Sequence, residues 1–484
     1  MKYSPTYFTI TSILLCCSIL SIGQDTVANF SEPIEKEADF KPIEFYDLGN
    51  HYGFLLGNKK SATPFTFFHF DSTLSVIKQT PLAATKGAKF LNSYVVNGQP
   101  CLFYSRSNQT NEQELLVFKI DTLGEIKPPF VLTKFKNNGG YKTGFKLAIS
   151  DDSKKLVVLV EHAFEKSKNE KITLILFNEN LKLTKIANKT LDVLVKHKRK
   201  NFPIISNSGS VYIVKKFFHK KSQYYVMFLN GASLEEAKIS LRTREVVSLR
   251  YSIAEDDQLH VFGFFSSPIF NNYEGVFSLK FNKSVHPVFK KEAFLTERVV
   301  HSFKSKKEIK THGFGLDNFH LKSIFKDSLA NHFLVAEHLY ISHDKMGSTG
   351  FRKGLLVVKF DKLGNFIWSS PLLIGQNELF QKIGSNWTSS IVYMVNSQVN
   401  IVYNQLNYKS KKNAELEGNN LHKIVHLALD NLGNPVKKVV SKLGEFDGDR
   451  MGVVPKYLYA NEESVFLMLQ NETKKSFRIV KLGD

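Results

Sequence analysis

From about residue 40 onward, short apolar runs alternate with polar turns, and little of the chain has the 3.6-residue period of an amphipathic helix. The clearest unit lies between Gly354 and Leu372. There an apolar run ends at Asp361, a short turn containing Gly364 follows, and a second apolar run continues through Trp368. Asp can bond to its own backbone two residues on, and Gly supplies the positive φ that such a turn needs. The pattern predicts a β-hairpin.

Variants of this hairpin recur along the chain, each with an Asp or Asn at the end of its first strand. These corner residues are Asp71, Asp121, Asn178, Asn230, Asn282, Asp361 and Asp430, and an eighth unit ends the chain at RIVKLGD. Consecutive corners are 50, 57, 52, 52, 79 and 69 residues apart. Two apolar strands precede each corner strand and another follows the corner. Repeats of this length with four strands are typical of the blades of a β-propeller.

We therefore predict an all-β fold, a single β-propeller of about eight four-stranded blades. Seven blades is the alternative if one terminal unit is not a blade, and a pair of β-sandwiches is the alternative architecture. The last unit lacks its outer strand, because the chain stops after the third. We expect a segment between Thr26 and Phe40 to supply it. Pairing the two chain ends would close the ring and remove two exposed sheet edges.

Residues 1–23 have the features of a secretory signal peptide. A basic residue is followed by an apolar run that ends at Ile22, and small residues precede an expected cleavage after Gly23. The run is too short to be a spanning helix. The propeller is thus expected to occupy residues 24–484 of an exported protein, in the periplasm, outside the cell or at its surface.

Three cysteines bear on this interpretation. Lipid attachment at Cys17 stays an open alternative, although Cys16 precedes it where a small residue is needed. Cleavage of the signal peptide would leave Cys101 as the only cysteine, so we expect no internal disulfide.

The longest connections are predicted to fall on one face of the ring. In a four-stranded blade the corners lie on one face, and the crossovers between blades lie on the other, together with the links between second and third strands. Residues 296–318, 339–353 and 406–422 are long segments of this crossover face. The basic runs at 196–200, 219–221, 304–307 and 409–412 belong to it as well. Loops on a rigid scaffold commonly carry binding surfaces, so we expect this face to bind a partner.

The formal net charge of +20 favours an anionic partner. Because the chain is expected to be exported, we predict a protein or an anionic glycan or polymer rather than nucleic acid, bound by a monomer. We also expect no transmembrane segment in the mature chain. The predicted binding residues are Lys196, Lys198, Arg199, Lys200, Lys220 and Lys221, with Glu337 and His338 beside the long segment of the sixth unit. A salt-bridged structural role is the alternative for these last two residues.

Catalytic motifs are missing from the sequence. It contains no HExxH zinc motif, no P-loop and no Gly-x-Ser-x-Gly nucleophile elbow. A glycosidase needs two carboxyl groups roughly 5–10 Å apart, and the innermost strands carry few acids. We assign no catalytic residue and expect no metal and no cofactor. A non-catalytic binding scaffold is the favoured function, and a carbohydrate-active propeller enzyme with a central-channel site is the alternative.

The motif Asp361-x-x-Gly364-x-x-x-Trp368, with partial forms at Asp121 and Asp430, resembles the repeats of quinoprotein-like and WD40-like propellers. The chain as a whole resembles uncharacterised secreted bacterial β-propeller proteins over most of residues 40–484. The resemblance implies the fold and export. Only one unit carries the Trp, so we expect Trp368 to pack between blades rather than to form part of a quinone site.

Overall fold

The computed structural model describes most of the expected propeller. The described residues are 28–31, 34–35, 41–49, 51–57, 65–82, 87–138, 141–163, 169–194, 199–219, 221–231, 233–267, 272–344, 347–379, 390–405, 423–442, 451–460, 464–471 and 476–483. The expected signal peptide, Cys16, Cys17 and the segment 406–422 lie outside them. Among the residues described, no helix is both long enough and apolar enough to span a membrane.

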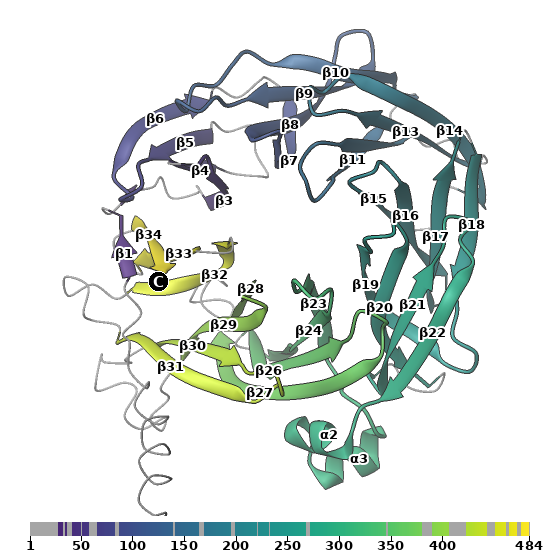
Figure 1. Ribbon diagram of the computed structural model, residues 1–484, viewed down its shortest axis with the longest axis vertical. Helices are drawn as coiled ribbons and strands as arrows, with labels where there is room; N and C mark the ends of the chain where they lie inside the picture. The colour runs from purple at the N-terminus through teal and green to yellow at the C-terminus, as the bar shows by residue number, and fades with distance from the viewer. Residues whose placement is uncertain are drawn as a thin grey trace, which may run out of the picture.

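The strands of the described residues form eight antiparallel sheets arranged in a ring, as Figure 1 shows. Six sheets have four strands and two have five. Seven of these sheets are built from strands that follow one another in the chain, and the eighth combines strands from the two ends of the chain. In the seven, the first strand lies nearest the centre of the ring (Figure 1). The predicted all-β propeller is confirmed, and a pair of sandwiches is excluded.

The blades follow chain order. The first three contain β3 (Lys41–Asp47), β4 (Tyr52–Gly57), β5 (Phe65–Phe70) and β6 (Val76–Leu82); β7 (Ala88–Val96), β8 (Gln99–Ser107), β9 (Glu112–Lys119) and β10 (Phe130–Lys136); and β11 (Gly144–Ile149), β12 (Leu156–Glu161), β13 (Asn169–Phe177) and β14 (Leu183–Leu194). The next two contain β15 (Arg199–Ile205), β16 (Val211–His219), β17 (Lys221–Asn230) and β18 (Ser233–Ile239); and β19 (Glu245–Ile253), β20 (Leu259–Ser266), β21 (Gly275–Phe281) and β22 (Pro287–Phe294).

The last three blades include the two five-stranded sheets. They contain β23 (Phe319–Lys326), β24 (His332–His338), β25 (Tyr340–Asp344), β26 (Gly347–Phe360) and β27 (Phe366–Leu379); β28 (Ser390–Val395), β29 (Gln398–Gln405), β30 (Lys423–Leu429) and β31 (Pro435–Lys442); and β32 (Met451–Ala460), β33 (Ser464–Asn471) and β34 (Ser476–Gly483) with β1 (Ala28–Phe30) and β2 (Ile34–Glu35).

The two ends of the chain close the ring. In the last blade β1 pairs antiparallel with β34, with Ala28 opposite Leu482, and β2 extends the pairing to Ile34 opposite Phe477. Between them, the buried Ser31 hydroxyl accepts a hydrogen bond of 3.0 Å from the Ile479 amide. The N-terminal segment thus supplies the missing outer strand, as predicted, and satisfies an edge that would otherwise be free.

The corners follow one hydrogen-bonding scheme. At Asp361, one carboxylate oxygen accepts from the amides of Leu363 and Asn365 at 2.9 and 2.7 Å. Asp71, Asp121, Asn178, Asn282 and Asp430 accept from the amides at the same two offsets. The residue three positions on has a positive φ, and Gly occupies that place in three of the six. Asn230 differs, because its strand turns back with Asn230 paired to Ser233.

Trp368 joins the sixth blade to the seventh. Its indole N–H donates to the Asn431 carbonyl at 3.0 Å, and its ring packs edge-on against Phe333. The ring also covers Gly433, where an added Cβ would lie 2.8 Å from Trp368 Cε3. The packing role predicted for this Trp therefore explains why the corner beneath it needs a glycine.

We expect Gly433→Ala to destabilise the protein more than Gly98→Ala does. Both glycines have a positive φ, +81° and +73°, which costs alanine about 1–2 kcal/mol. Only at Gly433 would the new methyl group also displace a ring, which adds about 1–3 kcal/mol. Urea denaturation of the two variants checks this, and equal losses would show that Trp368 moves aside freely.

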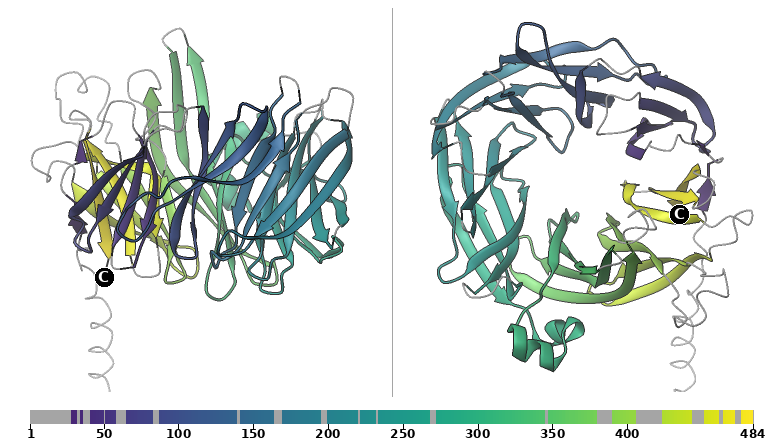
Figure 2. Two further views of the ribbon diagram at one scale, coloured as in Figure 1. Left: turned by 90° about the horizontal axis from the view of Figure 1, so that it is seen from above. Right: turned by 180° about the vertical axis from the view of Figure 1, so that it is seen from behind.

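Two of the predicted insertions on the crossover face are described. Residues 296–318 contain two short helices, α2 (Glu297–Phe303) and α3 (Lys306–His312), which the apolar periodicity did not predict. In α2, Val299, Val300 and Phe303 are buried in the core shared by the fifth and sixth blades. Residues 339–353 form a hairpin of β25 and the start of β26, which projects from the disc (Figure 2, left).

Candidate anion-binding site

Five of the eight predicted binding residues lie in the described part of the chain. Lys196, Lys198 and Lys220 lie outside the described residues, Arg199 begins β15, and Lys221 begins β17. Lys200 follows Arg199 in β15 and is exposed, while Glu337 and His338 end β24 in the sixth blade. Of the described residues, Arg199, Lys200 and Lys221 thus belong to the fourth blade, and Glu337 and His338 to the sixth.

Glu337 and His338 point to different surroundings although they are neighbours. The Glu337 carboxylate lies 3.6 Å from Lys322 Nζ and 3.9 Å from Arg352 Nε, so it belongs to an ion-pair network. His338 Nδ1 accepts a hydrogen bond of 3.2 Å from the Lys353 amide. Burial, followed by the charge of Lys353, lowers the pKa of His338 to about 4, so the ring is neutral at physiological pH.

A row of charged and aromatic side chains crosses the fourth blade. Lys200 in β15 stands directly opposite Lys216 in β16, which in turn stands opposite Tyr224 in β17. Residues two apart on a strand share a face, so Phe202 and Phe218 lie on this same face. Like charges directly opposite each other destabilise a sheet, so the Lys200–Lys216 pair is an unfavourable arrangement unless something compensates it.

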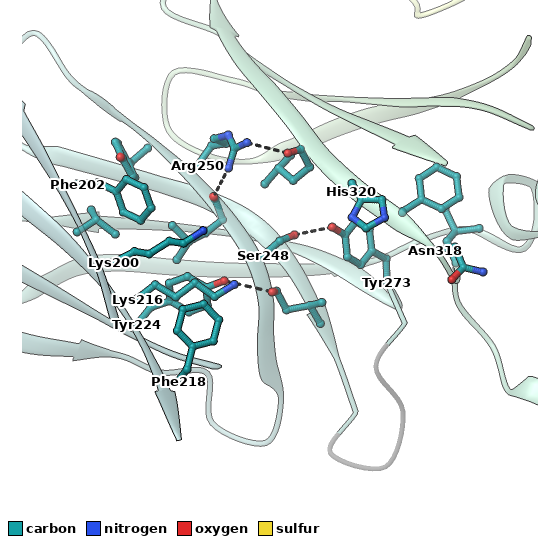
Figure 3. Close-up of a pocket in the computed structure, with 17 residues that line it drawn as sticks. Lys200, Phe202, Lys216, Phe218, Tyr224, Ser248, Arg250, Tyr273, Asn318 and His320 are labelled. Atoms are coloured by element: carbon teal, nitrogen blue, oxygen red, sulfur yellow. Dashed lines mark hydrogen bonds between the residues drawn. The ribbon is translucent and has the colours of Figure 1, made fainter. Parts of the chain in front are cut away.

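A third cation reaches the same place from the fifth blade. Arg250 of β19 donates from Nη2 to the carbonyls of Leu321 and Lys322 at 2.8 and 3.2 Å, and from Nη1 to the carbonyl of Leu249 at 3.2 Å. These bonds fix its guanidinium against the start of β23. Lys200, Lys216 and Arg250 line one cavity of about 700 Å³ (Figure 3).

This cavity lies on the crossover face, where the innermost strands β15, β19 and β23 begin. Its walls include Phe202, Phe218, Tyr224, Tyr251 and Tyr273. Among the described residues that line it there is no Asp or Glu. The cavity thus combines three cations with aromatic walls, and its own lining holds no countercharge.

Lys216 is held partly out of water. Its Nζ lies 5.0 Å from the Phe218 ring centroid and 5.2 Å from that of Tyr224. Burial, and then the charge of Arg250, lower the pKa of this lysine. Both causes disfavour the ammonium form, so an anion placed between Lys216 and Arg250 would relieve an existing electrostatic cost.

The preceding residue, Lys215, shows what a compensated lysine looks like in the same strand. It points to the opposite face of the blade, where its Nζ donates to the Glu170 carboxylate of the third blade, and both side chains are 1% exposed. The Asn201 amide donates to the second oxygen of Glu170 and to Glu161, at 2.8 Å each. Neighbouring lysines thus have opposite environments.

Sequence reasoning found Lys200 but missed Lys216 and Arg250. Both lie within strands, outside the loop runs that the charge count emphasised. The repeated Lys-x-Phe pattern of Lys200–Phe202 and Lys216–Phe218 could have indicated Lys216. Side chains alternate between the two faces of a strand, so the Lys and the Phe of each pair lie on the same face. Arg250 carried no comparable signal.

Other chemistry is limited in the described part of the chain. It contains no group of three His, Cys, Asp or Glu side chains that could hold a metal ion. Cys101 is a buried free thiol whose pKa is raised to about 12 by burial, which disfavours the nucleophilic thiolate. The cavity itself therefore has the residues to bind an anion but not a carboxylate pair for hydrolysis.

The sequence matches no protein-family model, and no curated protein resembles it at a significant level. Solved structures that resemble its fold include the WD40 domain of SCAP from fission yeast (11% identity, TM-score 0.41, covering 94% of this chain and 99% of that one). Two others are polysaccharide lyase Uly1 (8%, 0.40, 81% and 89%) and the β-propeller domain of the Trilobed protease from Pyrococcus furiosus (9%, 0.38, 83% and 98%). These similarities concern the fold only. The sheet order of the present chain is itself that of a β-propeller.

Proposed function

We propose that the mature chain is an exported, non-catalytic binding module that holds an anionic partner on its crossover face. The observation that carries this proposal is the cavity shared by Lys200, Lys216 and Arg250, which has no acidic residue among its described lining. Export rests on the N-terminal sequence alone.

A merely solvated basic surface would be arranged differently. Solvated lysines spread apart and keep their ammonium groups in water, because separation lowers their repulsion. Here Lys200 and Lys216 stand opposite each other on adjacent strands, and Lys216 is half-buried beside Arg250. A ligand that binds only the folded protein would offset this cost and stabilise the fold.

The enzyme alternative has less support. A two-carboxylate mechanism needs acidic side chains facing each other, whereas the described lining of this cavity is basic and aromatic. Glu337, which the sequence predicted as a binding residue, is engaged with Lys322 and Arg352. Binding is therefore the function that these residues support best.

Retention on immobilised heparin tests the proposal. We expect the mature chain to bind and to elute at lower salt after Lys200→Gln, Lys216→Gln and Arg250→Gln together. Losing one charged contact costs about 1.5–3 kcal/mol, so affinity should fall by at least about tenfold. The matched control replaces three exposed lysines of the corner face, Lys154, Lys182 and Lys362, by Gln. Equal shifts for the two triple variants would mean that only the diffuse net charge attracts the polymer.

A further inference from the structure

A second cavity of about 820 Å³ adjoins the first, between α3 and the β25–β26 hairpin. Its lining includes Phe303, Lys304, His338, Tyr340 and Lys353. Leu316, Asn318 and Phe319 line both cavities, so they form a shared wall between the two hollows.

The shared wall is fixed in place. The backbone of Leu316 exchanges two hydrogen bonds of 2.9 Å with that of Tyr273, and the carbonyl of Asn318 accepts from the Leu339 amide at 2.9 Å. Asn318 has a φ of +57° and an exposed side chain. The wall therefore presents an amide, which can both donate and accept, to a ligand that crosses it.

The second cavity differs from the first in its charge. Lys304 pairs with Asp317 at 2.5 Å, and Lys353 lies 3.9 Å from Glu308. Lys353 also donates to the Phe303 carbonyl at 3.1 Å. Donors and acceptors are thus mixed here, which suits uncharged hydroxyl and amide groups better than a further anion.

Exposed aromatic faces line both hollows. Phe202 in the first is 37% exposed and Tyr340 in the second is 47% exposed. Sugar rings join apolar faces to a rim of hydroxyl groups, so they match a wall that alternates aromatic rings with mixed polar groups. A polyanion with a charge on every unit, such as an acidic peptide, would match the first cavity alone.

We propose that the two cavities form one extended site for an acidic oligosaccharide, with an acidic sugar in the first and neutral sugars in the second. This inference rests on the proposed anion-binding function. It predicts that affinity grows with ligand length until both hollows are filled, which a single-anion site would not require.

The test is calorimetric titration of the mature chain with xylo-oligosaccharides of two, four and six sugars that carry a single uronic acid at one end and are otherwise neutral. We expect the hexasaccharide to bind at least about tenfold more tightly than the disaccharide. Tyr340→Ser should remove this gain and leave disaccharide binding unchanged, whereas Lys216→Met should weaken both. The control Tyr141→Ser changes an exposed tyrosine outside both cavities and should have no effect.

The outcomes separate this inference from the proposed function. If heparin retention depends on Lys216 but the hexasaccharide binds no better than the disaccharide, or neither binds, the extended site is wrong while the anion site stands. Tighter binding of a hexaglutamate peptide, with the same dependence on Tyr340, would overturn the assignment to sugars. Heparin retention that is insensitive to the first-cavity cations would overturn both.

Discussion

Lys215→Met should lower the free energy of unfolding by about 3–5 kcal/mol, because removing one partner of a buried ion pair leaves the other charge uncompensated. Lys215 and Glu170 are each 1% exposed and join the third blade to the fourth. Asn201 donates to the same carboxylate at 2.8 Å, but one amide cannot replace an ammonium group. Urea denaturation of the variant measures the loss.

Lys216→Met is the matched control, since it makes the same change one residue further along β16. Lys216 faces the cavity with no acid in its described lining, and its removal also relieves the repulsion with Lys200. The free energy of unfolding should therefore change by less than about 1 kcal/mol, as is usual for a substitution that breaks no buried ion pair. The double variant Lys215→Met with Glu170→Leu should be less destabilised than Lys215→Met alone. Similar losses for the two lysines would contradict the role given to Glu170.

The second large effect concerns acid. His260 and His332 are packed together between the fifth and sixth blades, with ring centroids 5.2 Å apart, and are 1% and 2% exposed. Burial, with the neighbouring His332 as the next cause, lowers the pKa of His260 to about 3. Burial, followed by Lys326, lowers that of His332 to about 4. Both rings are therefore held neutral in the folded protein.

Stability should fall as the pH is lowered from about 6.5 to about 3. In this window the unfolded chain binds protons that the folded chain does not. The stabilisation that comes from keeping the two histidines neutral is therefore complete above the unfolded pKa of about 6.5 and is lost as the pH falls. Each unit of depression is worth about 1.4 kcal/mol, so the two rings together should contribute on the order of 8 kcal/mol. Urea midpoints measured across this range give the slope.

His260→Phe should flatten that slope while keeping an aromatic ring against Phe262 and Phe289. His286→Gln, at an exposed position near a corner, is the control and should leave the slope as it is. If His260→Phe retains the full slope, the acid sensitivity must come from other groups in the protein.

The repeating backbone of this protein could be predicted from sequence because its causes are local. At six of the seven corners, the side-chain acceptor and the positive φ three residues on act within one turn, as at Asp361 and Gly364. Near-continuous apolar strands such as β12 indicated sheets covered on both faces, and Val157 and Val158, which face opposite sides of the sheet, are both fully buried. The missing outer strand of the last unit predicted closure by the N-terminal segment for the same reason, since a sheet edge needs a partner.

The short helices needed tertiary contacts. The structure shows a capping box of Ser305 and Glu308 at the start of α3, but each helix has only seven residues, too few to be stable alone. Packing of Val300 and Phe303 into the core of two blades supplies the remaining stabilisation of α2. An apolar pattern that spans only one or two helical turns was too short to predict these helices from the sequence.

The candidate site was decided by tertiary structure. Alternation along β16 guarantees that Lys215 and Lys216 face opposite ways, but it cannot say which of them meets a carboxylate. Glu170 comes from the preceding blade and Arg250 from the following one. Their positions relative to the two lysines depend on the angle at which neighbouring sheets pack. A turn is fixed by contacts within five residues, whereas the charge around a lysine depends on side chains that only the closed ring brings together.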